Sequence, residues 1–155
     1  MLGFFELMLR MPGTMYSLEH TMVEVRRGIV TGLLLGYPAS EMQKLARGML
    51  KRTTALMKYV GLRDFTTMLF RLKLNRYMPE LGDDEFFVSN LAVKEEYRGH
   101  GSATRLMKKA EEIALGAGLQ KVSLYVETDK RILPERYSKH GLMGFCKMTK
   151  SLPRQ

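Results

Sequence analysis

Residues 20–37 show the alternation of apolar and polar side chains that is typical of β-strands. One face of the first strand would hold Val23 and Val25. A turn signal at residues 27–28 ends that strand, and the apolar run 29–36 predicts a second, buried one. We therefore expect an antiparallel hairpin here.

Two amphipathic helices are predicted after the hairpin. Ser40 and Gln43 have the spacing of a capping box, and apolar residues recur at helical spacing up to Val60. Asp64 is a candidate N-cap for a second helix. Residues 40–77 hold nine basic residues against two acidic ones, a net charge of +7. The segment is typical of a solvated helix face, although it could also dock an acidic partner or an anionic membrane.

A strand, a glycine turn, a helix and another strand then follow in the order of a βαβ unit. The run 86–93 predicts the first strand, and Gly99 and Gly101 lie in the turn. The helix spans residues 104–115, and its buried side would hold Leu106, Met107, Ala110, Ile113 and Ala114. The alternating segment 121–127 predicts a second strand, parallel to the first with a right-handed crossover.

Shorter elements are expected near the two ends of the chain. Residues 2–10 predict a short helix before a Pro-Gly turn, and residues 134–141 predict a helix started by proline and ended by glycine. Residues 144–152 predict a final strand.

The turn of the βαβ unit carries a specific motif. Residues 91–106 read Leu-Ala-Val, four further residues, then Tyr-Arg-Gly-His-Gly-Ser-Ala-Thr-x-Leu. This run resembles the acyl-CoA loop of the GNAT acetyltransferases, whose pattern is Arg/Gln-x-x-Gly-x-Gly/Ala. The resemblance is strongest over residues 87–127 and implies that Ser89 and Asn90 mark a bulge in their strand.

The resemblance implies an α/β (α+β) fold, with a mixed antiparallel and parallel sheet flanked by helices. Residues 1–155 would form a single GNAT-like domain that has a βαβ cofactor unit, a helical insertion at about residues 40–77, and shortened N- and C-terminal elements.

The resemblance also implies acetyl-CoA as the cosubstrate. Backbone N–H groups of residues 99–104 would hold its pyrophosphate, and the backbone of residues 91–93 would pair with its pantetheine arm. The implied binding residues are Leu91, Ala92, Val93, Arg98, Gly99, His100, Gly101, Ser102, Ala103 and Thr104. The His100 side chain is expected to be a bystander, because the loop works through its backbone. No metal site is predicted.

The implied reaction is direct attack of a primary amine on the acetyl thioester in a ternary complex. Tyr137 occupies the position where the family often has its general acid, and it would protonate the leaving thiolate. Glu127 is our candidate for the base that deprotonates the amine, and Tyr125 is the fallback. His20 is interpreted as a surface or packing residue rather than as a base. Cys146 is interpreted as a small buried residue rather than as a nucleophile.

Two departures from the family pattern leave an alternative open. Lys130 stands where the family often has an Asn, and the chain has fewer elements than usual at its ends. The alternative is a non-catalytic regulatory or interaction protein that binds acyl-CoA. Because missing elements would expose sheet edges, we also predict a homodimer that covers an edge or exchanges a terminal segment.

Composition narrows the remaining choices. The chain has 155 residues, 45% of them apolar, which suits one domain with its own core. A formal charge of +9 favours an anionic ligand, but few aromatic residues interleave the basic segment, so docking to nucleic acid or a membrane ranks last. A single cysteine excludes an intramolecular disulfide framework, and we expect a cytoplasmic protein.

Overall fold

The structure is a computed structural model that describes residue 6 and residues 8–51, 80–128 and 144–153. Its elements, in chain order, are η1 (Leu18–His20), β1 (Thr21–Arg26), β2 (Ile29–Pro38), η2 (Ala39–Glu41), α2 (Met42–Lys51), β3 (Glu85–Val93), η4 (Glu95–Tyr97), α5 (Ser102–Gly116), β4 (Lys121–Thr128) and β5 (Gly144–Ser151). Each predicted strand is present, with bounds that differ by one or two residues.

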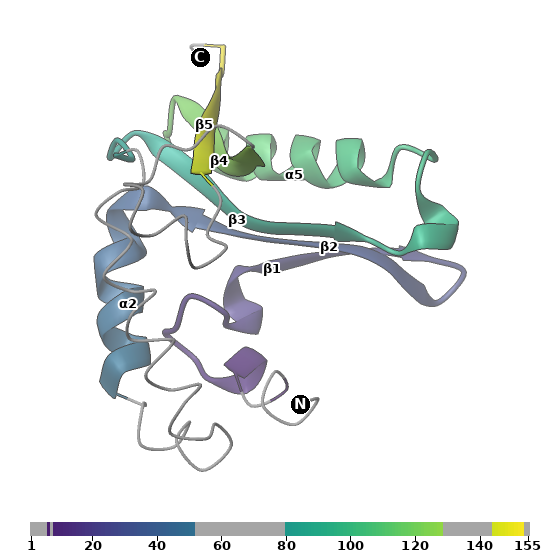
Figure 1. Ribbon diagram of the computed structural model, residues 1–155, viewed down its shortest axis with the longest axis horizontal. Helices are drawn as coiled ribbons and strands as arrows, with labels where there is room; N and C mark the ends of the chain where they lie inside the picture. Colours follow the sequence, from purple (N-terminus) through teal and green to yellow (C-terminus); the bar gives the residue numbers. More distant parts are fainter. Residues whose placement is uncertain (1–5, 7, 52–79, 129–143, 154–155) are drawn as a thin grey trace.

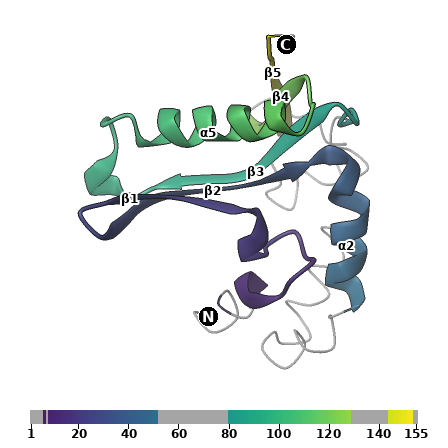
Figure 2. The ribbon, with the colours of Figure 1, turned by 180° about the vertical axis from the view of Figure 1, so that it is seen from behind.

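The strands form one mixed sheet in the order β1-β2-β3-β4-β5. Only β3 and β4 pair in parallel within it, and the other neighbours are antiparallel. Helix α5 lies along one face, whereas α2 and η1 lie on the other side (Figures 1 and 2). The predicted α/β (α+β) architecture and its βαβ unit are therefore confirmed.

Both faces of the sheet carry an apolar core. On the α5 face, Leu34 and Ala110 are fully buried and belong to one cluster with Phe86, Val88, Leu106, Ala114, Val122 and Leu152. On the opposite face, Tyr37 and Phe87 pack with Leu35 and Leu45, the last of which comes from α2. The strand alternation read from the sequence places these residues in two layers.

Helix α5 begins and ends as backbone chemistry requires. Gly101 precedes it with a φ of 76°, which favours glycine over any residue with a Cβ. At the other end Gly118 has a φ of 74°, and the Leu119 N–H donates to the Ala114 carbonyl at 2.9 Å. This is the Schellman arrangement that closes a helix.

Two local predictions were wrong. Ser40 does not cap a helix, because it lies within η2, where the Met42 N–H donates to the Ala39 carbonyl instead of to a side chain. Ile113 is 39% exposed, because the buried stripe of α5 repeats every four residues and leaves it at the side.

Several other predicted elements lie outside the described residues. They comprise most of the predicted insertion beyond residue 51 and the predicted helix at residues 134–141. Across the described parts of the chain, no helix has the length and apolar character needed to cross a membrane.

Candidate functional site

A gap opens in the sheet between β3 and β4. Their parallel pairing ends at Val88 and Leu124, although β3 continues to residue 93 and β4 to residue 128. Figure 1 shows β3 continuing beside β2 after β4 has left it. The β2–β3 register shifts at the same place, because Leu35 pairs with Asn90 and the next residue pairs with Val88. Ser89 is thus the extra residue of a β-bulge, which confirms the sequence prediction.

The backbone of β3 beyond the bulge faces this gap at alternate residues. The Lys94 N–H donates to the Thr31 carbonyl on β2 at 2.9 Å, so residue 94 directs its backbone groups toward β2. Because successive residues of a strand alternate sides, Val93 and Leu91 direct theirs toward the gap. Ala92 has its backbone groups on the β2 side, so it offers none to a ligand in the gap.

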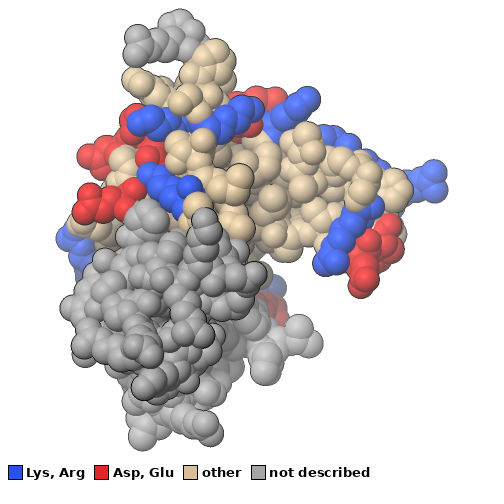
Figure 3. All heavy atoms as spheres, turned by 45° about the horizontal axis from the view of Figure 1, so that its top comes forward, with Lys and Arg blue, Asp and Glu red and all other residues tan. Residues whose placement is uncertain are grey.

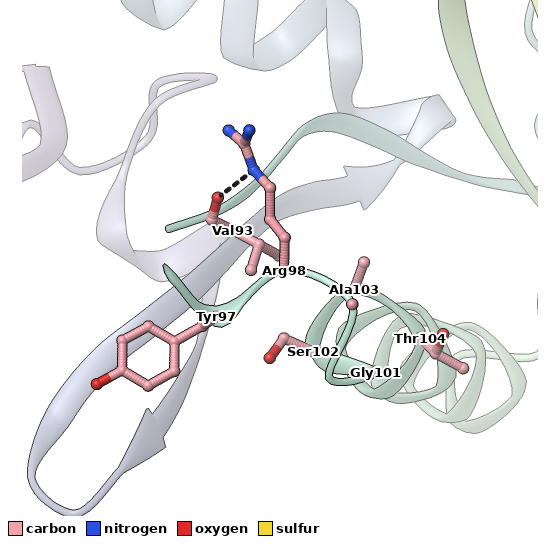
Figure 4. A pocket seen from close by; sticks show the side chains of 8 residues that line it. Val93, Tyr97, Arg98, Gly101, Ser102, Ala103 and Thr104 are labelled. Carbon is pink, nitrogen blue, oxygen red and sulfur yellow. Dashed lines mark hydrogen bonds between the residues drawn. The ribbon is translucent and has the colours of Figure 1, made fainter. Parts of the chain in front are cut away.

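A pocket of about 340 Å³ lies where the gap meets the start of α5. Figure 4 shows its lining, which consists of Val93, Tyr97, Arg98, Gly99, Gly101, Ser102, Ala103 and Thr104. Gly99 and Gly101 both have positive φ, at 74° and 76°. A Cβ built on Gly99 would contact nothing within 4 Å, so the turn is open at this point.

The first turn of α5 presents unpaired donors to the pocket. The first helical bond joins the Arg105 N–H to the Gly101 carbonyl at 3.0 Å, and no side chain caps the helix. The N–H groups of Ser102, Ala103 and Thr104 therefore precede the helical ladder. Together with the positive end of the helix dipole, they form a site suited to an anion such as a pyrophosphate.

Arg98 lies at the mouth of the gap. Its Nε donates to the Val93 carbonyl at 3.3 Å, and Figure 4 shows the side chain pointing away from Gly101. The guanidinium is therefore hydrogen-bonded to the carbonyl with which a ligand lying along β3 would pair. A ligand that pairs with this carbonyl would share it with Arg98 or displace Arg98 from it, since a carbonyl oxygen can accept two hydrogen bonds.

On the face opposite α5, aromatic residues line the start of the gap. Tyr125 is the first residue of β4 beyond the last β3 pair, and its ring lies 5.1 Å from that of Phe87. Phe87 in turn lies 5.9 Å from Tyr37, and His20 lies 5.7 Å from Tyr37 on the other side. These four side chains connect the gap to the beginning of β1.

The tyrosines of this cluster hold their protons tightly. Burial raises the pKa of Tyr37 to about 12. Burial, together with the charge of Glu85, also raises the pKa of Tyr125. Both phenols therefore stay protonated at neutral pH, which suits Tyr125 to donate a proton better than to remove one.

Of the three predicted catalytic residues, the structure places the Tyr125 side chain at the start of the gap. Glu127 lies in β4 two residues after Tyr125, on the strand that borders the gap. Tyr137 lies outside the described residues. Cys146 is exposed on β5, so its interpretation as a small buried residue was wrong.

Sequence reasoning missed a charged cluster behind the glycine turn. Glu24 on β1 accepts hydrogen bonds from Arg105 on α5, at 3.0 and 2.7 Å, and from Arg26 at 3.1 Å. The one available signal was the charged pair Glu24 and Arg26. It lies on the same face of β1 as Met22, and α5 covers that face. Nothing in the sequence linked that pair to a residue 81 positions away.

Comparison with known proteins gives the family. The acetyltransferase (GNAT) family model matches residues 59–142, which is more than half of the chain. The chain belongs to the GNAT acetyltransferase family. A GNAT protein is an acyltransferase that uses acyl-CoA, so the pocket at the start of α5 and the gap beside β3 lie in a fold made for acetyl transfer.

Solved structures support the GNAT fold. The match with a crystal structure of an acetyltransferase covers 98% of this chain and 80% of the acetyltransferase chain, with 18% sequence identity and a TM-score of 0.63. An N-acetyltransferase from Staphylococcus aureus Mu50 matches 89% of this chain and 73% of its own, with 17% identity and a TM-score of 0.53. A search of curated proteins finds no match.

Proposed function

We propose that this GNAT protein transfers an acetyl group from acetyl-CoA to a primary amine on a small-molecule or peptide acceptor. One observation carries the proposal: the uncapped N-terminus of α5 and the open backbone of β3 meet at one pocket. The N–H groups at the start of α5 would bind the pyrophosphate, and the backbone of Leu91 and Val93 would pair with the pantetheine arm. The two sites adjoin each other, as the two parts of the ligand do.

The chemistry needs positioning and two proton transfers. The amine nitrogen forms a bond to the thioester carbon, the carbon–sulfur bond breaks, and the thiolate takes up a proton. We assign the proton donor as Tyr137 and the base that receives the amine proton, directly or through water, as Glu127. Tyr125 remains the fallback base; because burial and the charge of Glu85 raise its pKa, it would have to lose its phenolic proton before it could act.

The test is release of free CoA thiol from acetyl-CoA in the presence of a panel of amines. The panel would include polyamines, amino sugars, free lysine and peptides with free N-termini. Turnover with one class supports the proposal and identifies the acceptor. Binding of acetyl-CoA without turnover across the panel would favour a regulatory protein, and absence of binding would reject the pocket as the acyl-CoA site.

Tyr137→Phe tests the acid assignment. Loss of the phenolic proton should lower kcat about 100-fold, within the usual range for general acid catalysis, and leave the Kd for acetyl-CoA unchanged. Tyr16→Phe is a matched control, because the substitution also removes one phenolic hydroxyl group. Tyr16 packs in the cluster that contains Tyr37 and has no part in the proposed chemistry. Equal kcat values for the two variants would remove Tyr137 from the acid role.

A homodimer in the cytoplasm completes the proposal. Strands β1 and β5 form the outer edges of the described sheet. Val23 and Val25 on β1 are each 54% exposed, so the edge presents apolar side chains as well as backbone. Light scattering at micromolar concentration should report twice the mass of the chain, and a monomer would reject the dimer.

The described part of the α5 side lacks the charge pattern of a nucleic-acid surface. Figure 3 shows the α5 side with Lys and Arg atoms interspersed with Asp and Glu atoms around an uncharged area. A nucleic-acid surface would gather positive charge into a continuous stripe. On the described part of this face the charges are mixed.

A further inference from the structure

An ion cluster formed by Glu24, Arg26 and Arg105 holds the glycine turn from behind. The Glu24 side chain is 13% exposed, and its Oε1 accepts from Arg105 Nη2 at 2.7 Å and from Arg26 Nε at 3.1 Å. Burial acts to raise the pKa of Glu24, but hydrogen bonds from Arg105, Ser102 and Arg26, together with the charge of Arg105, lower it overall. The carboxylate is therefore ionised at neutral pH and ties β1 to α5.

Both arginines of this cluster also hold one carbonyl of the turn. The His100 carbonyl accepts from Arg26 Nη2 at 3.1 Å and from Arg105 Nη2 at 3.0 Å. In a planar trans peptide, the carbonyl and the following N–H point in opposite directions. Anchoring the His100 carbonyl on the cluster therefore directs the Gly101 N–H away from it. Gly101 lines the pocket, whereas His100 does not.

A second peptide of the turn is fixed in the same way. His100 Nδ1 lies 2.7 Å from the Arg98 carbonyl. Because a carbonyl can only accept, Nδ1 is the donor of this bond. The Gly99 N–H on the same peptide then points away from the His100 ring. Gly99 also lines the pocket, so two successive glycine donors are oriented by contacts outside it.

We propose that Glu24 is a positioning residue for acyl-CoA binding, which acts through Arg105 and Arg26 to orient the His100–Gly101 peptide toward the ligand. The inference rests on the proposed function, because it requires the pyrophosphate to bind at this turn. It assigns a role to a carboxylate on the edge strand that is distant in sequence from the motif and does not line the pocket.

Charge and positioning predict opposite effects for Glu24→Gln. If only net charge mattered, removing a negative charge near a polyanionic ligand would tighten binding. If Glu24 positions the turn, the amide weakens its hold on both arginines, the His100 carbonyl is freed, and binding weakens. The loss of one hydrogen bond to a charged group corresponds to about a 10-fold change in Kd.

The experiment is calorimetric titration of the full chain with CoA, followed by acetyl-transfer kinetics. For Glu24→Gln we expect the Kd for CoA and the KM for acetyl-CoA to rise about 10-fold. The kcat at saturating acetyl-CoA and the KM for the acceptor should stay unchanged. The control is Glu112→Gln, which makes the same charge change on α5 at an exposed pair with Lys109. Its Kd should equal that of the wild type.

Arg105→Gln distinguishes positioning from general damage. It should also weaken CoA binding, and Glu24→Gln/Arg105→Gln should be no weaker than the worse single variant, because both act on one carbonyl. Additive losses, or unchanged or tighter binding by Glu24→Gln, would overturn the inference while leaving the proposed function intact. Failure of the wild type to bind CoA would instead reject the proposed function and this inference together.

Discussion

Replacing Lys147 by Met is expected to destabilise the protein strongly. Lys147 Nζ on β5 lies 2.7 Å from Glu85 Oε1 on β3, and it also donates to the Glu80 carbonyl at 2.8 Å. The pair reaches across β4, and its side chains are 18% and 5% exposed. Met keeps the unbranched shape of lysine but leaves Glu85 as a buried charge without its cation.

The size of this effect follows from burial. Removing one partner of a buried ion pair costs about 3–5 kcal/mol, because the remaining charge is uncompensated. For a chain of this length such a loss lowers Tm by roughly 6–20 °C. Lys150→Met is the matched control on the same strand. Lys150 pairs with Glu111 at 2.6 Å, but its side chain is 63% exposed, so its loss should cost about 0–1 kcal/mol.

The pH dependence of stability provides a second way to compare the Lys147→Met and Lys150→Met variants. Burial acts to raise the pKa of Glu85, but the hydrogen bond and charge of Lys147, together with hydrogen bonds from Ser123 and the Gly82 backbone, lower it overall. The pair therefore stabilises the wild type above the unfolded pKa of about 4.3, and this contribution is lost as pH falls through the lower folded value. In Lys147→Met the Glu85 pKa should rise above its ordinary value. Protonation of Glu85 at lower pH then removes the uncompensated charge and restores part of the lost stability.

The assay is urea unfolding of both variants at pH 7 and at about pH 4.5, followed by circular dichroism. The deficit of Lys147→Met should be large at pH 7 and should shrink at the lower pH. The reasoning is refuted if Lys147→Met and Lys150→Met lose equal stability at pH 7. It is also refuted if the Lys147→Met deficit does not change with pH.

Four further substitutions, one of them a control, test backbone geometry and core packing. Gly48→Ala should destabilise α2, because the added Cβ would collide with the Gly13 carbonyl, even though alanine favours helices over glycine by about 1 kcal/mol. Gly116→Ala is the control: its added Cβ meets nothing within 4 Å, so thermal unfolding should show a neutral or stabilising effect. Gly101→Ala should cost about 1–2 kcal/mol through its φ of 76° and raise the KM for acetyl-CoA; an unchanged KM would separate the turn from the ligand. Leu34→Ala, at a fully buried core position, should cost about 2–5 kcal/mol in urea unfolding, and a loss below 1 kcal/mol would contradict the described core.

Sequence patterns predicted the parts of this fold that are set by local rules. The hairpin, the βαβ unit and the buried residues Leu106, Ala110 and Ala114 follow from side-chain period and from glycine positions. The bulge at Ser89 was also predicted, but only through the family resemblance. A polar pair inside a strand does not by itself separate a bulge from an outward-facing position.

Contacts between distant segments could not be predicted from the same patterns. Glu24 and Arg105 meet only because β1 passes under the start of α5, an arrangement that depends on the order of the strands in the sheet. The buried partnership of Glu85 with Lys147 likewise needs β5 to lie next to β4. Periodicity identifies the face that a residue occupies, but it does not identify the residue across from it.

The bulge explains why core and site share one strand. Before it, Phe86 and Val88 direct their side chains to the α5 face. Leu91 pairs with Leu34 and Val93 pairs with Gly32, so their side chains also lie on that face, although they stand at odd positions instead of even ones. A regular strand would have sent them to the opposite layer. One inserted residue thus lets a single strand bury its first half under α5 and present Val93, in its second half, to the pocket at the start of that helix.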